Sequence, residues 1–146
     1  MKTLVHVSTS AMLSGTVYAA TYSPDIAIAC FLSGILLDLD HLLDYFLLAR
    51  EQYSLKNFRS WCDDARWERI ILLLHSYEIY FVLCVITFHF QHELLIGLML
   101  GTGLHLMLDE LGNRFSQRDY MLSPWFYFLV YRISVGFHNE KLRREK

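Results

Sequence analysis

Apolar residues are gathered in four long runs along the chain, each close to the length of a membrane-spanning helix. The runs cover residues 4–22, 26–49, 70–90 and 94–111. A helix needs about 20 mostly apolar residues to cross the ~30 Å hydrocarbon core of a bilayer. The pattern therefore predicts an all-α, polytopic bundle of four transmembrane helices, formed by residues 1–146 as a single membrane-embedded domain.

The polar connections between these runs differ in length. Residues 23–25 (Ser-Pro-Asp) and 91–93 (Gln-His-Glu) are short turn sequences, which predict tight helical hairpins on either side of the middle connection. The middle connection, residues 50–69, is long and mixes charges with Tyr53, Phe58, Trp61 and Trp67. This composition is typical of a segment at the depth of the lipid headgroups.

A fifth apolar run begins at Ser123 and Pro124, which form a helix-start pair of N-cap and first-turn proline, and it ends near Phe137. Fourteen helical residues reach only about 21 Å, and Arg132 lies among them. We therefore expect a C-terminal helix that lies in the interface or is re-entrant, not a fifth span.

The distribution of basic residues gives an orientation. With four spans, all 13 lysines and arginines fall on one side of the membrane, and such residues collect on the cytoplasmic side. Both termini are then cytoplasmic. The N-terminus also resembles a secretory signal, because Met1-Lys2 is followed by an apolar stretch with the small residues Ala19 and Ala20. Cleavage there would leave three spans and remove His6.

Composition excludes several classes of protein. Hydrophobic residues make up 54% of the chain and charged residues 19%, which excludes disordered and low-complexity classes. A net charge of −2 gives no nucleic-acid footprint. Cys30, Cys62 and Cys84 are an odd number without paired spacing, so we expect small buried hydrophobic residues and not a disulfide framework.

Ionisable residues inside the apolar runs point to a site. The second run contains Asp38, Asp40, His41 and Asp44, which helical spacing places on one face. A central aspartate costs about 3 kcal/mol in a membrane helix. These carboxylates must therefore be off-centre, protonated, paired or bound to a cation, and they must face the bundle interior.

The other runs carry ionisable residues at a similar depth. His6, His75, Glu78, His105 and Asp109 all lie near the cytoplasmic ends of their runs. At 1.5 Å per residue, most of the ionisable residues fall in a layer about 3 to 14 Å below the cytoplasmic boundary. His105 with Asp109, and His75 with Glu78, each share a helical face. The pattern predicts one site near that boundary.

The donor types indicate which ion the site would bind. Several imidazoles together with several carboxylates suit Zn²⁺, Mn²⁺ or Fe²⁺ better than Ca²⁺. We expect one or two ions, with zinc the first choice. A metal-free network of hydrogen-bonded polar side chains is the alternative.

These motifs resemble a known family. Asp38-Leu39-Asp40-His41, His75-Ser76 and the run from Gly103 to Asp109, together with His6, resemble the YdjM family of small bacterial inner-membrane proteins, described as membrane-bound metal-dependent hydrolases. The resemblance extends through Trp125 and implies a bacterial inner-membrane location. The HxxxD helix is remotely similar to zinc-dependent phospholipase C and P1-type nucleases. The metal ligands that the resemblance implies are His6, Asp40, His41, His75, His105 and Asp109, with Asp38 as a further ligand or a neighbouring acid.

The expected reaction is metal-assisted hydrolysis of a phosphoester carried by a lipid or lying close to the membrane. A carboxylate, Asp38 or Glu78, would take the proton from the attacking water. Membrane lipid is the expected partner. A non-catalytic membrane protein with a structural metal or a buried polar network is the second hypothesis. A metal transporter is the third, because the outer halves of the runs hold few polar groups for a pathway.

The orientation can be tested with reporter fusions. A cytoplasm-active reporter should work at the C-terminus, and an export-dependent reporter should work when inserted at residues 91–93, because the basic residues hold the other face inside. A C-terminus that reports from outside would contradict four spans and favour a fifth. If N-terminal sequencing shows that the mature protein begins near Thr21, the first run is instead a cleaved signal.

Overall fold

The protein was analysed as a computed structural model that describes residues 3–48, 58, 68–115 and 120–145. The described residues are mainly helical, which confirms the all-α prediction at this coarse level. The chain divides into two compact units, and each is built from two separate stretches. Unit 1 comprises residues 1–37 and 77–117, and unit 2 comprises residues 38–76 and 118–146.

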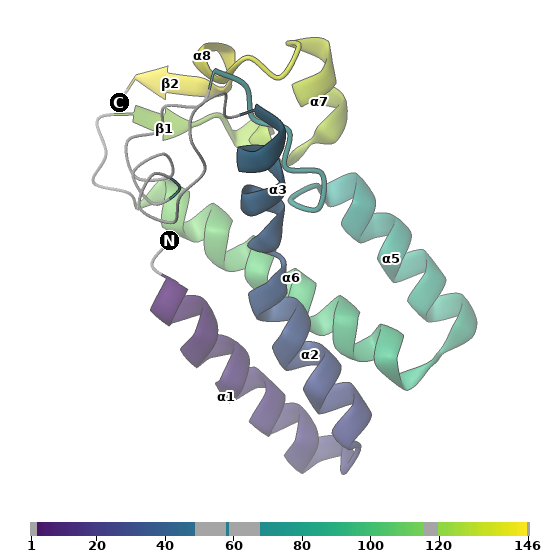
Figure 1. The fold of residues 1–146 in the computed structure, drawn as a ribbon. Coiled ribbons are helices and arrows are strands. Elements are labelled where there is room, and N and C mark those ends of the chain that lie inside the picture. The colour runs from purple at the N-terminus through teal and green to yellow at the C-terminus, as the bar shows by residue number, and fades with distance from the viewer. Residues whose placement is uncertain (1–2, 49–57, 59–67, 116–119, 146) are drawn as a thin grey trace. The chain divides into compact units, whose positions relative to one another are not determined.

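Unit 1 contains two helical hairpins. Helices α1 (Thr3–Thr21) and α2 (Pro24–Leu36) form the first, and α5 (Tyr77–Phe90) and α6 (Glu93–Arg114) form the second (Figure 1). The hydroxyl of Ser23 caps α2 by accepting a hydrogen bond from the backbone N–H of Ile26. The same hydroxyl donates to Glu93 Oε2 over 2.6 Å. Both predicted hairpin turns are confirmed.

Glycines bring the backbones of α2 and α6 together. A Cβ atom on Gly97 would collide with the carbonyl oxygen of Ile26, and a Cβ on Gly101 would collide with the carbonyl oxygen of Cys30 and the hydroxyl of Ser33. The α2–α6 contact is the most extensive between helices of this unit. Cys30 is fully buried there, as the sequence predicts. Small residues at this spacing therefore serve close helix packing.

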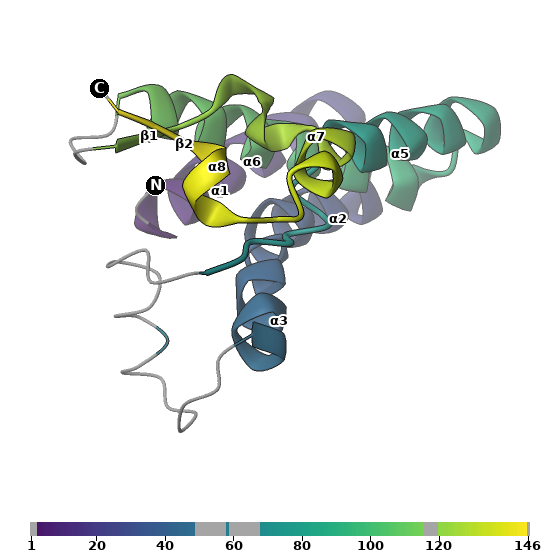
Figure 2. The ribbon, with the colours of Figure 1, turned by 90° about the horizontal axis from the view of Figure 1, so that it is seen from above.

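Unit 2 combines short elements. Helix α3 (Leu39–Leu48) is followed, after residues outside the description, by an irregular segment at 68–76. Strand β1 (Tyr120–Leu122) pairs antiparallel with β2 (Arg143–Glu145), and the two lie side by side in both views (Figure 1 and Figure 2). Between them lie a 3₁₀ helix (Pro124–Tyr127), α7 (Leu129–Ser134) and α8 (Asn139–Leu142).

The prediction of one C-terminal helix is therefore wrong beyond its first turn. Ser123 does cap the first turn, by accepting from the N–H of Trp125. Phe128 then adopts an extended backbone (φ −95°, ψ 116°), which ends the helix. Gly136 and Phe137 both have positive φ values and separate α7 from α8. The apolar pattern predicted the start of the segment but not these two breaks.

The membrane prediction is supported only in part. Within the described residues, two helical stretches are long and apolar enough to cross a bilayer by length and composition: Pro24–Leu48 and Glu93–Arg114. Helix α5 has only 14 residues, because it begins at Tyr77 and not at residue 70 as predicted. At 1.5 Å per residue it reaches about 21 Å. The predicted interfacial connection at 50–69 lies almost wholly outside the described residues.

The α2–α6 packing gives a matched pair of glycine variants. We expect Gly101→Ala to lower the free energy of unfolding by about 1 to 3 kcal/mol, because the added methyl group would force apart two closely packed backbones. Gly15→Ala is the control, because a Cβ there meets no atom within 4 Å. It should be neutral or stabilising by about 0.5 to 1 kcal/mol. Thermal unfolding in detergent measures both, and equal effects would contradict the packing argument.

Candidate functional site

One group of potential ligands lies in unit 1, where α6 faces the start of α1. His6 Nε2 lies 3.1 Å from Asp109 Oδ1, and His105 Nε2 lies 3.5 Å from Asp109 Oδ2. The two imidazole rings stack with their centroids 4.2 Å apart. Both histidines are buried, and only 2% of the surface of His6 is exposed. One carboxylate therefore faces two buried imidazoles, and the predicted shared face of His105 and Asp109 is confirmed.

The tautomer of His105 follows from its second contact. Its Nδ1 lies 2.8 Å from the carbonyl oxygen of Gly34. A carbonyl oxygen only accepts, so Nδ1 carries the proton and donates it. In a neutral ring Nε2 then presents a lone pair toward Asp109. An imidazole nitrogen and a carboxylate in this arrangement call for a proton or a metal cation between them.

His6 adds an independent sign of an unsatisfied polar site. Its Nδ1 is buried and has no hydrogen-bond partner among the residues that the structure describes. Buried polar atoms without a partner are uncommon and often mark a ligand, ion or water position. His6 comes from the first turns of α1, so the group joins residues that are about 100 positions apart in the chain.

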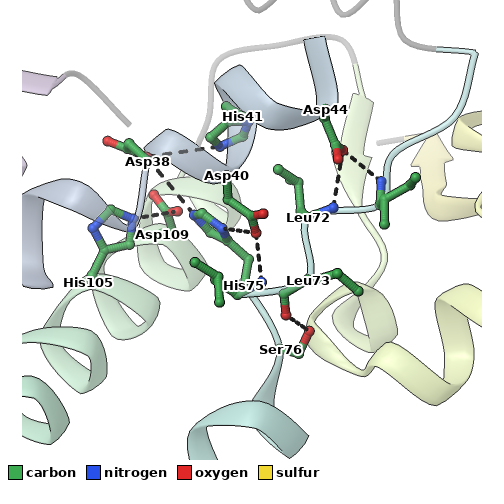
Figure 3. Close-up of polar contacts among 12 residues, drawn as sticks. Asp38, Asp40, His41, Asp44, Leu72, Leu73, His75, Ser76, His105 and Asp109 are labelled. Carbon is green, nitrogen blue, oxygen red and sulfur yellow. Dashed lines mark hydrogen bonds and ion pairs between the residues drawn. The ribbon is translucent and has the colours of Figure 1, made fainter. Parts of the chain in front are cut away.

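A second group lies in unit 2, where Asp38 precedes α3. His41 Nε2 is 3.9 Å and His75 Nε2 is 4.0 Å from the same oxygen, Asp38 Oδ1 (Figure 3). The rings of His41 and His75 meet edge to face with their centroids 5.0 Å apart. His75 is buried, whereas the side chain of Asp38 is 34% exposed. Again one carboxylate faces two imidazoles.

Asp40 contacts His75 of this second group on the ring nitrogen that does not face Asp38. Its Oδ2 accepts a hydrogen bond from the N–H of Leu74 over 2.7 Å and lies 3.3 Å from His75 Nδ1 (Figure 3). A carboxylate on Nδ1 leaves Nε2 directed toward Asp38. Histidines that bind metals commonly have such a carboxylate on the ring nitrogen away from the metal. Asp40, which the resemblance implies as a ligand, is placed here as the partner that orients His75.

Residues 70–76, which contain His75, are irregular and not helical. The predicted i, i+3 helical pair of His75 and Glu78 is therefore wrong, because α5 begins only at Tyr77. Glu78 lies in the first turn of α5, in unit 1, and is half-buried. The i, i+3 spacing of His75 and Glu78 predicts a shared face only if one helix contains both residues, and α5 begins after His75.

Two charged residues hold the irregular segment. Asp44 Oδ2 accepts hydrogen bonds from the N–H groups of Ile71 (2.7 Å) and Leu72 (3.1 Å). Arg132, which is fully buried, donates to the carbonyl oxygens of the same two residues over 2.7 and 2.8 Å. From the sequence, Arg132 indicates only that a fifth span does not form, and its role in this segment is not predicted. An arginine inside an apolar run was itself the signal that could have identified it.

Both ligand groups fit a divalent transition metal. Two ligand atoms bound to a tetrahedral ion at about 2.1 Å lie about 3.4 Å from each other. The separations of 3.1 and 3.5 Å around Asp109 match this value, and those of 3.9 and 4.0 Å around Asp38 are slightly wider. Imidazole and carboxylate donors suit zinc, manganese or iron. Within each unit, imidazoles and a carboxylate that could hold a metal ion are thus brought together, as predicted, although their chemistry does not identify the metal.

Comparison of the chain with known proteins finds no relative. No family model matches the chain, and no curated protein or solved structure matches it. The relation to the YdjM family therefore stays a prediction based on the motifs.

Proposed function

We propose that this chain is a metal-dependent hydrolase of the bacterial inner membrane that acts on a phosphoester at the cytoplasmic face. One observation carries the proposal. Each unit contains a buried histidine, His105 or His75, whose Nδ1 faces an acceptor and whose Nε2 faces a carboxylate. This is the arrangement of a neutral imidazole ready to bind a metal. The resemblance to the YdjM family supports the same reading.

The ligands belong to two groups. One or two ions would be held by His6, His105 and Asp109 in the first group and by His41, His75 and Asp38 in the second. A bound divalent ion supplies Lewis acidity, which polarises a phosphoryl oxygen and makes a water molecule more acidic. Carboxylates and neutral imidazoles are donors that match this ion without any thiolate.

The carboxylates of the chain supply the proton acceptor. Asp38 is the first candidate, because its side chain is one third exposed and can reach water while it faces two imidazoles. Glu78 is the second candidate, since it is half-buried in the first turn of α5. Either carboxylate would take the proton from the attacking water as a general base. Asp40 orients His75 and does not take part in proton transfer.

Exposed apolar surface supports a membrane setting. Helix α5 buries only Thr87 among its described side chains, and large apolar residues along it are exposed, including Phe81 (68%) and Phe88 (72%). A soluble protein seldom exposes so much contiguous apolar surface. The cations at residues 141–146 favour anionic headgroups. A lipid-borne or membrane-proximal phosphoester is therefore the proposed substrate class.

A second function, a structural role, is favoured by one observation. Asp40 and Asp44 are buried, and their oxygens already accept backbone N–H groups of the 70–76 segment. Carboxylates satisfied in this way need no metal. A metal or a polar network that merely stabilises the fold would use the same residues without a substrate.

Metal content separates binding from a metal-free network. We expect elemental analysis of the detergent-purified protein to find one or two divalent transition-metal ions per chain, because buried carboxylates and imidazoles need a compensating charge. Asp109→Asn and His75→Gln should each lower the content. His89→Gln, at an exposed histidine near the end of α5, is the control and should leave it unchanged. Trace metal that neither site variant alters would leave only the metal-free network.

Turnover separates the enzyme from the structural role. Wild-type protein, loaded with metal in lipid, should hydrolyse members of a panel of phospholipids and phosphodiesters. Asp38→Asn or Glu78→Gln should lower turnover about 10²- to 10⁴-fold, the usual contribution of a general base. Glu78→Gln should keep the fold and the metal. Asp38→Asn also changes a proposed ligand, so its turnover is compared with that of the wild type at equal metal content. Asp25→Asn, at an exposed carboxylate, is the control. If the wild type hydrolyses no member of the panel, and removal of the metal unfolds the protein, the structural role should replace the enzyme hypothesis.

A further inference from the structure

The segment at residues 70–76 is held by charged side chains from two directions. Its N–H groups at Ile71, Leu72 and Leu74 are bound by the carboxylates of Asp44 and Asp40. Its carbonyl oxygens at Ile71, Leu72 and His75 are bound by the guanidinium of Arg132. Ile70, Leu72, His75 and Ser76 of this segment are buried, and buried backbone groups without secondary structure must be satisfied in this way. The hydrogen bonds that a helix would make internally are here made by three ionisable side chains.

Leu72 shows that these hydrogen bonds impose an unusual backbone conformation on the segment. It is buried and has a φ of 41°, in the left-handed region that a leucine rarely adopts. Such a backbone persists only where its surroundings over-determine it, and such positions cluster at functional sites. Both polar groups of Leu72 are bound, the N–H by Asp44 and the carbonyl by Arg132. The strained turn lies three residues before His75.

Arg132 reaches the same residues that place the His75 ring. Besides the two carbonyls of the turn, it donates to the carbonyl oxygen of His75 over 3.3 Å and to the hydroxyl of Ser76. Its guanidinium lies 5.4 Å from the centre of the Phe126 ring, and the residue is fully buried. A planar guanidinium with five donors can serve several acceptors at once, which a lysine ammonium cannot do in the same geometry.

We propose that Arg132 is a positioning residue for the metal ligand His75. It fixes the backbone of His75 from one side, while Asp40 fixes Nδ1 of the ring from the other. Together these contacts direct Nε2 toward Asp38. The described hydrogen bonds of Arg132 are with residues 71, 72, 75 and 76, so its effect on metal binding acts through the 70–76 segment. This inference rests on the metal binding of the proposed function.

Cobalt is the probe for this role, because its visible absorption reports ligand geometry as well as binding. Full-length protein in detergent is stripped of metal and titrated with Co²⁺ as wild type, Arg132→Lys and Arg132→Gln. Arg143→Lys is the matched control, since Arg143 lies in the same C-terminal stretch and donates to Asn139 Oδ1 over 2.8 Å. Circular dichroism and thermal unfolding of the metal-free proteins measure fold and stability separately.

The expected result is a Co²⁺ affinity lowered about 10- to 100-fold in Arg132→Lys, with a changed absorption band, at a temperature where the variant is fully folded. This is the usual effect of losing a group that orients a metal ligand. Arg143→Lys should stay within about twofold of the wild type, well below that range. Arg132→Gln should bind no better than Arg132→Lys. If Arg132→Gln does not fold, the lysine variant, which keeps the positive charge, still decides.

Two results would overturn the inference, and they have different meanings. If the wild type binds Co²⁺ and folded Arg132→Lys binds it with the same affinity and spectrum, Arg132 does not position His75, although the proposed function stands. A lower unfolding temperature alone, without a change in Co²⁺ binding, has that same meaning. If the wild type binds no Co²⁺, the proposed metal-dependent function fails and this inference fails with it.

Discussion

Compensation of buried charge is the constraint on which both units of this protein depend. Asp40, Asp44 and Arg132 are all buried in an apolar chain, and an uncompensated ion in such surroundings costs several kcal/mol. Among the described residues, hydrogen bonds to backbone groups are a shared part of their compensation. The two carboxylates bind the N–H groups of one short segment, and the arginine binds its carbonyl oxygens. The charged side chains thus replace the internal hydrogen bonds of a helix.

The same constraint explains the groups around Asp109 and Asp38. Each carboxylate lies against two imidazoles, and an imidazole relieves a buried carboxylate only if a proton or a metal ion lies between them. The carbonyl of Gly34 fixes the proton of His105 at Nδ1, and Asp40 lies against Nδ1 of His75. Both rings then direct Nε2 at a carboxylate. The transition metal that we propose for these groups would also explain why this direction is fixed.

Helix packing in unit 1 supplies one of these fixed contacts. Gly34 can present its carbonyl to His105 because α2 and α6 approach closely at Gly97 and Gly101. Larger side chains at these positions would separate the backbones. The apolar face and the polar site are therefore not independent parts of the fold. Packing that looks purely structural sets the tautomer of a proposed metal ligand.

The sequence by itself determined the features that arise from neighbours along the chain. Turn residues and caps fixed the two hairpins, and the i, i+4 spacing placed His105 and Asp109 on one helical face. Only the tertiary structure decided the fate of residues 70–76. Their apolar side chains continue the pattern of a helix, so local periodicity predicted a span from Ile70. Hydrogen bonds with Asp44 and Arg132, 27 or more residues away in sequence, hold the segment in an irregular form instead. Sequence periodicity cannot predict such contacts, because they depend on which distant side chains fold against the backbone.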